Sequence, residues 1–192
     1  MKKYQIIYAD PPWAFSNRLR TSKKVNGKYA QYKPSTTVGK KYQTQSGEWI
    51  KNLSVDSISS SNAILFLWTT DAHLSLALEV IKAWGFEYKT IGFQWNKKEK
   101  SGKQVCYMGQ WTMKGTEICL LATKGQIHGE IKSHKVRQLV EATRGEHSEK
   151  PGEVRSRIVQ LMGELSRIEL FAREKTDGWD VWGDEVESDI VL

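Results

Sequence analysis

Five short apolar runs are spaced along the chain, and each is bounded by polar or turn-forming residues. They are residues 5–9, 63–68, 90–95, 118–122 and 167–172. Runs that are apolar throughout, instead of alternating with polar residues, are typical of strands covered on both faces. We therefore expect these segments to be buried β-strands.

Helical spacing separates some of these runs. Leu74, Leu78 and Ile81 recur at helical spacing, and Gly85 marks a helix end. A second helix is expected to begin near Pro151 and to end before Gly163, with one side buried. The residues expected on that side are Val154, Ile158, Leu161 and Met162. Strands that alternate with helices predict an α/β fold with a mostly parallel central sheet flanked by helices, although the pattern does not specify the strand order.

The length of 192 residues suits one domain with its own core. No apolar run approaches the about 20 residues of a membrane span, so we expect no membrane association. The apolar stretch after Lys2 and Lys3 is too short for a signal peptide and is interrupted by Asp10. We therefore expect a cytoplasmic protein.

Cysteine and histidine give no metal pattern. Cys106 and Cys119 are the only cysteines and have no C-x-x-C spacing. The four histidines share no ligand spacing with them or with each other. We expect reduced thiols and no metal site.

The net charge of +7 favours a polyanionic partner, because lysine and arginine gain from releasing the counterions of phosphates. Two basic stretches depart from the core pattern, at about residues 16–47 and 96–103, and we interpret them as loop insertions in a single domain covering 1–192. The alternative is that both are only solvated loops. From the first stretch we select the following lysines as candidate nucleic-acid contacts: Lys23, Lys24, Lys40 and Lys41.

A short motif follows directly on the first apolar run. Asp10, Pro11, Pro12 and Trp13 should lie at the carboxyl end of a strand, where open α/β sheets bind ligands. Each proline fixes its own φ and cannot donate to a sheet ladder, so the turn should be stiff. Asp10 is then expected at the edge of a cleft, with the aromatic face of Trp13 just beyond it.

This motif suits methyl transfer to the exocyclic amine of adenine. The N6 lone pair is delocalised into the purine ring, so the amine is a weak nucleophile unless acceptors hold its hydrogens. Asp10 and the backbone carbonyl of Pro11 are two such acceptors. Trp13 is placed to stack on a base taken out of its helix. The alternative is a structural turn at a strand end.

Several blocks along the chain extend the motif in one order. They read IIYADPPW at 6–13, YQTQSGEW at 42–49, ILFLWTT at 64–70, WGFEY at 84–88, QWNK at 94–97, GQWTMKGTEICLLATKG at 109–125, KPGEV at 150–154 and IELFAREKTDGWDVWGDEV at 168–186. Together they resemble the family of the seventy-kilodalton subunit of the mRNA adenosine N6-methyltransferase, the adenine-N6 methyltransferases with a DPPW motif, and in particular its short bacterial and phage members. The resemblance implies a Rossmann-like fold that uses S-adenosylmethionine, with a permuted order in which the catalytic motif precedes most cofactor-binding segments.

The resemblance also implies roles for individual residues. Those matching the catalytic motif are Asp10, Pro11, Pro12 and Trp13. Those matching cofactor contacts are Asp10, Phe171, Arg173, Gly183, Asp184 and Glu185. Those matching the base cleft are Tyr42, Trp95, Lys97 and Trp111. Asp184, Lys175, Thr176 and Thr116 depart from the residues usual in the family or in its mRNA enzyme. Four other tryptophans are interpreted as structural, namely Trp68, Trp84, Trp179 and Trp182.

The sequence thus predicts an adenine-specific, S-adenosylmethionine-dependent DNA methyltransferase with nucleic acid as its partner. An RNA adenine-N6 methyltransferase and a catalytically silent nucleic-acid-binding subunit stay open as alternatives. The intact motif favours activity, and the short single-domain architecture favours DNA. A monomer and a homodimer are equally compatible with the sequence.

Overall fold

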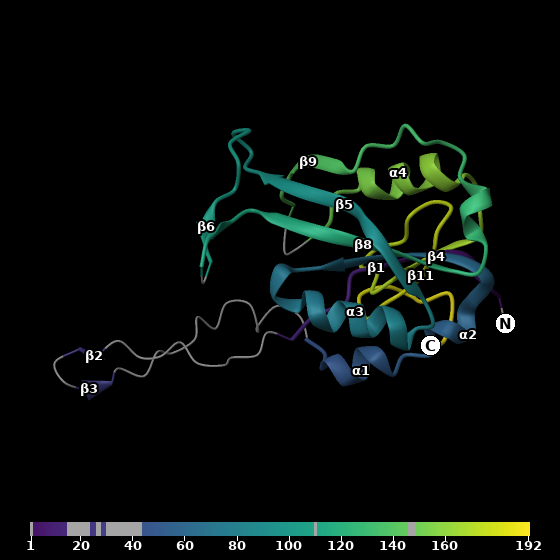
Figure 1. Ribbon diagram of the computed structural model, residues 1–192, viewed down its shortest axis with the longest axis horizontal. Coiled ribbons are helices and arrows are strands. Elements are labelled where there is room, and N and C mark those ends of the chain that lie inside the picture. Colours follow the sequence, from purple (N-terminus) through teal and green to yellow (C-terminus); the bar gives the residue numbers. More distant parts are fainter. Residues whose placement is uncertain (1, 15–23, 26–27, 30–43, 110, 146–148) are drawn as a thin grey trace.

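The computed structural model describes residues 2–14, 24–25, 28–29, 44–109, 111–145 and 149–192. Its centre is a seven-stranded sheet in the order β11-β10-β1-β4-β8-β5-β9 (Figure 1). The strands are β1 (Tyr4–Ala9), β4 (Ser59–Thr69), β5 (Glu87–Lys98), β8 (Thr116–Lys124), β9 (Leu139–Thr143), β10 (Arg167–Leu170) and β11 (Asp180–Trp182). Two short ribbons stand apart from it, β2 (Lys24–Val25) with β3 (Lys28–Tyr29), and β6 (Tyr107–Met108) with β7 (Met113–Lys114).

The sheet is mostly parallel, as the alternation of strands and helices predicts. β1 pairs in parallel with β10 and β4, β10 with β11, and β5 with β9. β8 is antiparallel to both of its neighbours, β4 and β5. The carboxyl ends of the other strands therefore share one edge of the sheet, and β1 ends at this edge between β10 and β4.

Both faces of the central strands are covered, which confirms the interpretation of the apolar runs for β1 and β4. The expected buried run 90–95 is only partly covered, because Phe93 and Trp95 are its only buried residues. On β1, Ile7 and Ala9 pack into one core and Ile6 and Tyr8 into the other. The first core lies under α1 (Gly47–Lys51), α2 (Val55–Ile58) and α3 (Leu74–Ala83), and the second lies under α4 (Glu153–Met162). Figure 1 shows α1 and α3 on one side of the sheet and α4 on the other.

The expected helix after the second apolar run is α3, but its buried side differs in part from the expectation. Ile81 is buried as expected, together with Ala77 and Val80, whereas Leu74 and Leu78 are each 38% exposed. The leucine spacing therefore predicted the helix correctly, but it predicted only part of the buried face.

The other expected helix, α4, matches more closely. Val154, Ile158 and Met162 are spaced four residues apart and are buried, while Leu161 is half-buried. Gly163 ends the helix with a φ of 77°, a left-handed conformation that suits glycine.

The remaining elements are short. Two 3₁₀ turns are present, η1 (Asp71–His73) and η2 (Ile127–Glu130). β5 continues to Lys98, so the first three residues of the expected 96–103 insertion belong to a strand. None of the described helices is long and apolar enough to cross a membrane. Within the described part of the chain, no group of three or more His, Cys, Asp or Glu side chains is arranged to hold a metal ion.

Candidate active site

The proline motif lies at the carboxyl end of β1, where its position in the sequence predicts it. The backbone N–H of Trp13 donates to the carbonyl of Pro11 at 2.9 Å, and the N–H of Gln45 donates to the carbonyl of Pro12 at 2.9 Å. The indole N–H of Trp13 donates to the backbone carbonyl of Trp68 at 3.0 Å. With two fixed proline φ angles, these bonds hold the turn in one shape.

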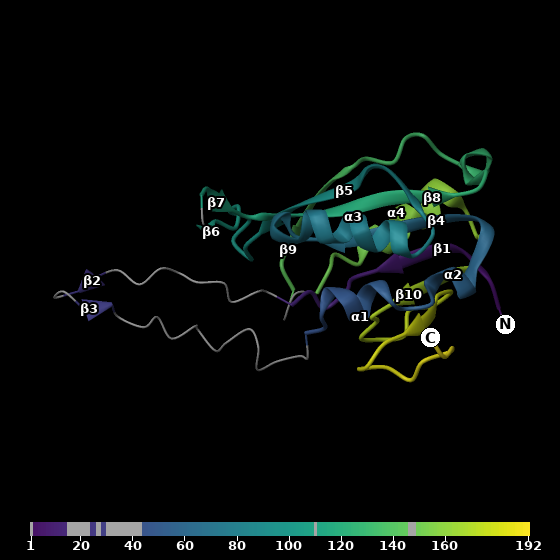
Figure 2. The same ribbon diagram turned by 60° about the horizontal axis from the view of Figure 1, so that its bottom comes forward.

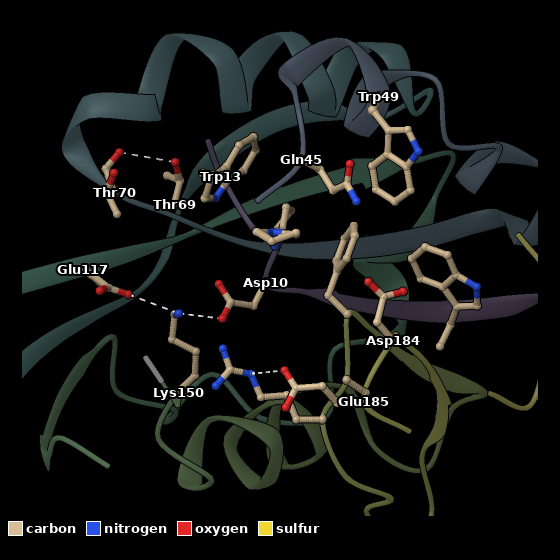
Figure 3. A pocket seen from close by; sticks show the side chains of 16 residues that line it. Asp10, Trp13, Gln45, Trp49, Thr69, Thr70, Glu117, Lys150, Asp184 and Glu185 are labelled. Carbon is tan, nitrogen blue, oxygen red and sulfur yellow. Dashed lines mark hydrogen bonds and ion pairs between the residues drawn. The ribbon is translucent and has the colours of Figure 1, made fainter. Parts of the chain in front are cut away.

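A pocket of about 620 Å³ opens beside this turn. Figure 3 shows its lining side chains. They come from the motif and from segments distant in sequence, namely Asp10, Pro11, Pro12, Trp13, Gln45, Trp49, Thr69, Thr70, Glu117, Lys150, Phe171, Ala172, Arg173, Trp182, Asp184 and Glu185. Ala9 of β1 pairs with Leu170 of β10, and this pairing places Asp10 beside the residues that follow β10.

A buried lysine joins two carboxylates in this pocket. Lys150 Nζ lies 2.6 Å from Asp10 Oδ2 and 3.4 Å from Glu117 Oε2, and 10% of the Lys150 side chain is exposed. Figure 3 shows the ammonium group between the two carboxylates. Lys97 pairs with the second carboxylate oxygen of Glu117. Two cations thus neutralise two anions, as burial of charged groups requires.

Burial and charge act on this network in opposite directions. Burial raises the pKa of the Asp10 carboxyl above its ordinary value, and Lys150 offsets only part of that effect. Burial acts in the same direction on Glu117, but Lys150 and Lys97 outweigh it, and the pKa of that carboxyl is lowered. Burial alone would lower the pKa of Lys150, yet Asp10 and Glu117 raise it. The pKa of Asp10 is thus raised and that of Glu117 is lowered, and 26% of the Asp10 side chain is exposed.

Three aromatic rings form one wall of the pocket. The Phe171 ring lies 5.4 Å from that of Trp182 and 6.5 Å from that of Trp49, and the two indoles stack at 6.4 Å. Ser46 caps α1 by accepting a hydrogen bond from the Trp49 N–H at 3.1 Å, which sets the direction of the Trp49 side chain. This wall offers flat apolar surface to a ring system.

Phe171 has a φ of 63°, in the left-handed region that non-glycine residues rarely adopt. Such a conformation costs free energy and persists where the surroundings enforce it, often at binding sites. Here it directs the chain from the end of β10 into the pocket wall. We therefore interpret the strain at Phe171 as part of how the wall is built.

Polar groups border the aromatic wall. Arg173 Nε lies 3.6 Å from Glu185 Oε1, and Asp184 lies beside Glu185 on the pocket lining. Carboxylates accept hydrogen bonds from hydroxyl groups, and a guanidinium binds a carboxylate. A pocket of this volume, with one aromatic wall and this polar border, fits a nucleoside that carries a charged tail.

Gly183 determines how closely the turn after β11 approaches the chain after β10. A Cβ at this position would lie 2.1 Å from the carbonyl oxygen of Ala172. We expect Gly183→Ala to displace the turn that carries Asp184 and Glu185, and to lower the free energy of unfolding by about 1–3 kcal/mol. Urea unfolding measures this loss. Gly129→Ala is the matched control, because an added Cβ there meets no atom within 4 Å. Equal stability of the two variants would contradict this account of the turn.

The motif, the pocket and their order along the chain match one protein family. Residues 4–185 match MT-A70. The chain belongs to the MT-A70 family. This confirms the family resemblance and agrees with the predicted methyltransferase fold. A protein of a Mycoplasma species named Type II methyltransferase M.MunI is 38% identical over 189 residues, which cover 96% of this chain and 78% of that protein.

Eukaryotic relatives are more distant. A protein of Arabidopsis thaliana named N(6)-adenosine-methyltransferase MT-A70-like is 24% identical over 88% of this chain. The human N(6)-adenine-specific methyltransferase METTL4 is 24% identical over 96% of it. The matched regions cover 22% and 38% of those two proteins, so this chain corresponds to only part of each.

The structure brings together most residues that the MT-A70 resemblance assigned to catalysis and cofactor binding. Those on the pocket lining are Asp10, Pro11, Pro12, Trp13, Phe171, Arg173, Asp184 and Glu185. Gly183 lies next to them and acts through the backbone packing described above. Trp13 borders the pocket, but its ring stacks on His73 and is only 6% exposed. In this conformation the Trp13 ring packs against the protein, and its faces are not exposed for stacking on a substrate base.

The residues expected at the base cleft are not gathered at the pocket. Trp95 is 1% exposed, its indole N–H donates to the carbonyl of Ala142, and it packs in the core and does not line the pocket. Lys97 is not on the pocket lining, and it pairs with Glu117, which is. Trp111 is exposed on the β6–β7 ribbon and is absent from the lining. Lys23, Lys40, Lys41 and Tyr42 lie outside the described residues, as does the side chain of Lys24.

Sequence reasoning missed several lining residues. Trp182 was interpreted as structural but forms part of the aromatic wall, and Trp49 was not considered. Lys150 and Glu117 received no role, although both stand inside blocks that carry the family resemblance. A signal for Glu117 was available, because a lone carboxylate at the start of an apolar strand must find a partner when it is buried.

Proposed function

We propose that this chain is an S-adenosylmethionine-dependent methyltransferase that modifies the N6 amine of adenine in DNA. The observation that carries the proposal is the position of Asp10. Its carboxylate lies at the carboxyl end of β1, in the pocket that the aromatic wall borders, and it pairs with Lys150. A hydrogen-bond acceptor at this place can hold an amine beside a bound cofactor.

The pocket residues fit the cofactor. Phe171 offers aromatic surface to an adenine ring, Asp184 and Glu185 offer acceptors to ribose hydroxyls, and Arg173 offers a guanidinium to a carboxylate. When bound, S-adenosylmethionine supplies a methyl group on a positively charged sulfur. The rest of the chemistry falls to the protein, which must position the target amine and receive its proton.

Two acceptors of the motif hold the amine. The Asp10 carboxylate accepts one N6 hydrogen, and the Pro11 carbonyl accepts the other with the lone pair that Trp13 leaves available. Their pull favours a tetrahedral nitrogen whose lone pair is free to form the new N–C bond. The proton that this nitrogen then loses passes to Asp10, which already accepts a hydrogen bond from the amine and whose pKa burial raises above the ordinary value.

DNA is favoured over RNA as the substrate. The Mycoplasma relative that aligns with nearly the whole chain is named a Type II methyltransferase, the designation used for DNA-modifying enzymes. A more distant fungal relative is named an RNA methyltransferase, and an Arabidopsis relative is named a non-catalytic subunit. The complete motif in this chain argues against the non-catalytic alternative.

The substrate is tested with cofactor labelled in its methyl group. Purified protein is incubated with plasmid DNA, with the same DNA made single-stranded, and with an RNA copy of it. We expect label in duplex DNA. Labelling of RNA alone would replace the proposed substrate, and labelling of none would favour a nucleic-acid-binding subunit without activity.

Cofactor binding is tested separately by calorimetry. We expect one S-adenosylmethionine per chain, and we expect Arg173→Ala to weaken that binding about tenfold or more, because it removes a charged hydrogen-bond donor. Arg137→Ala, at an exposed arginine that does not line the pocket, should leave the affinity unchanged. Equal affinities of the two variants would exclude Arg173 from the cofactor site.

A further inference from the structure

One apolar surface near the pocket has no part in the function proposed above. It is the Trp111 hairpin, the described residues 107–109 and 111–114, in which β6 pairs antiparallel with β7. Trp111 is 92% exposed, and Met108 and Met113, which lie opposite each other, are 79% and 59% exposed. An indole and two methionines gathered in water indicate a surface that a partner covers.

The hairpin stands beside the pocket. Figures 1 and 2 both show β6 at the end of the molecule where the carboxyl end of β1 lies. Lys114 Nζ lies 3.0 Å from Asp71 Oδ2, and Asp71 directly follows Thr70, which lines the pocket. A molecule bound in the pocket and extending past Thr70 therefore meets this hairpin.

The base of the hairpin is fixed to the sheet. The Lys97 N–H donates to the Gly115 carbonyl at 2.9 Å, and the Val105 N–H donates to the Lys97 carbonyl at 2.8 Å. Val105 is buried, and a Cβ on Gly115 would lie 2.0 Å from its carbonyl oxygen. The Lys97 side chain also contacts Glu117, so the hairpin base connects to the network around Lys150. The chain is therefore hydrogen-bonded to the sheet on both sides of the hairpin, and the hairpin tip projects from this fixed position.

The turn between β5 and β6 carries positive charge. Lys100 and Lys103 are exposed on the preceding turn, and neither forms an ion pair with a described carboxylate. Lysines and an exposed aromatic ring on one projecting segment suit a polyanion that also presents flat bases. A second copy of the chain fits less well, because a two-fold contact between hairpins would bring the same lysines together.

We infer that Trp111 enters the base stack of duplex DNA at the place that the target adenine leaves. The inference rests on the proposed function, because an adenine must leave the duplex before its N6 can reach Asp10. Apolar side chains that insert between base steps unstack them, and an indole can replace the stacking surface of a missing base. Lys100 and Lys103 then lie along the phosphates.

The test uses the full chain and two duplexes. Sequencing of plasmid DNA methylated by the wild type defines the target site. One duplex pairs the target adenine with thymine, and the other has an abasic position opposite it, which lets the adenine leave the stack more easily. On the paired duplex we expect Trp111→Ala to lower kcat/KM about tenfold or more relative to the wild type. On the abasic duplex the difference between the variant and the wild type should be much smaller. Trp111→Phe should retain most activity on both.

Tyr88→Ala is the control, since Tyr88 is 41% exposed near the start of β5, the strand end opposite the hairpin, and it should leave both rates unchanged. An unaffected Trp111→Ala, or an equal loss on both duplexes, would overturn the inference while the proposed function stands. A change from dimer to monomer on sedimentation of Trp111→Ala would assign the hairpin to a protein interface and also overturn it. A wild type that methylates no DNA would overturn the proposed function and this inference together.

Discussion

Replacing Asp10 with alanine is expected to lower methyl transfer by about a hundredfold or more while the protein stays folded. The carboxylate provides a hydrogen-bond acceptor at the carboxyl end of β1. It contributes little to the packing of the core, so its loss should not unfold the protein. Lys150 keeps Glu117 as a partner, so the buried ammonium is not left without an anion. Initial rates with labelled cofactor, together with thermal unfolding of the same samples, measure both halves of the prediction.

The matched control for this variant is Asp56→Ala. Asp56 also pairs with a lysine, Lys124, but at the opposite end of the sheet, where α2 precedes β4. It should keep the wild-type rate. Near-normal turnover of a folded Asp10→Ala protein would contradict the role of Asp10 in holding the amine.

Replacing Lys150 with methionine should affect both stability and the pH dependence of activity. Asp10 would then lie in the pocket without its paired lysine, while Glu117 would keep Lys97, and this loss should cost about 3 kcal/mol or more of the free energy of unfolding. Adding Asp10→Asn to this variant should restore part of the stability, because it removes the carboxylate that has lost its paired lysine. Urea unfolding of the single and double variants measures both effects.

The pH profile gives a second measurement on the same variant. The ionised Asp10 is the active form, and burial holds its pKa above the ordinary value, so wild-type kcat should fall as the pH drops through that raised pKa. Lys150 lowers the pKa of Asp10, so its removal should move this acid limb to higher pH. An acid limb at the wild-type position in Lys150→Met would show that the pair does not control the catalytic carboxylate.

Much of the fold followed from the sequence because burial leaves a pattern. The apolar runs became β1, β4, β5, β8 and β10. The central strands β1 and β4 are apolar because they are covered on both faces, whereas β5 is only partly covered. The antiparallel direction of β8 was not predictable, because an apolar run has no direction. β9 and β11 were missed, as they lie at the two edges of the sheet and are short.

The candidate site was predictable where a local motif carried the chemistry. Asp10 follows a strand and two prolines, and this context alone placed it at a ligand-binding edge. Lys150 had no such context, because one buried lysine looks like every other lysine in a basic chain. The sequence around a tryptophan does not say whether its ring faces the core or a pocket. Trp95, expected in the base cleft, is buried, and Trp182, interpreted as structural, packs against the core and also lines the pocket.

The measurement that tests the central claim most directly is nucleoside analysis of DNA methylated by the purified protein. The DNA is digested to nucleosides, and mass spectrometry compares them with those from a reaction with Asp10→Ala. We expect N6-methyldeoxyadenosine with the wild type and none above background with the variant. Methylated cytosine in place of methylated adenine, or equal amounts of N6-methyldeoxyadenosine from both proteins, would contradict the account.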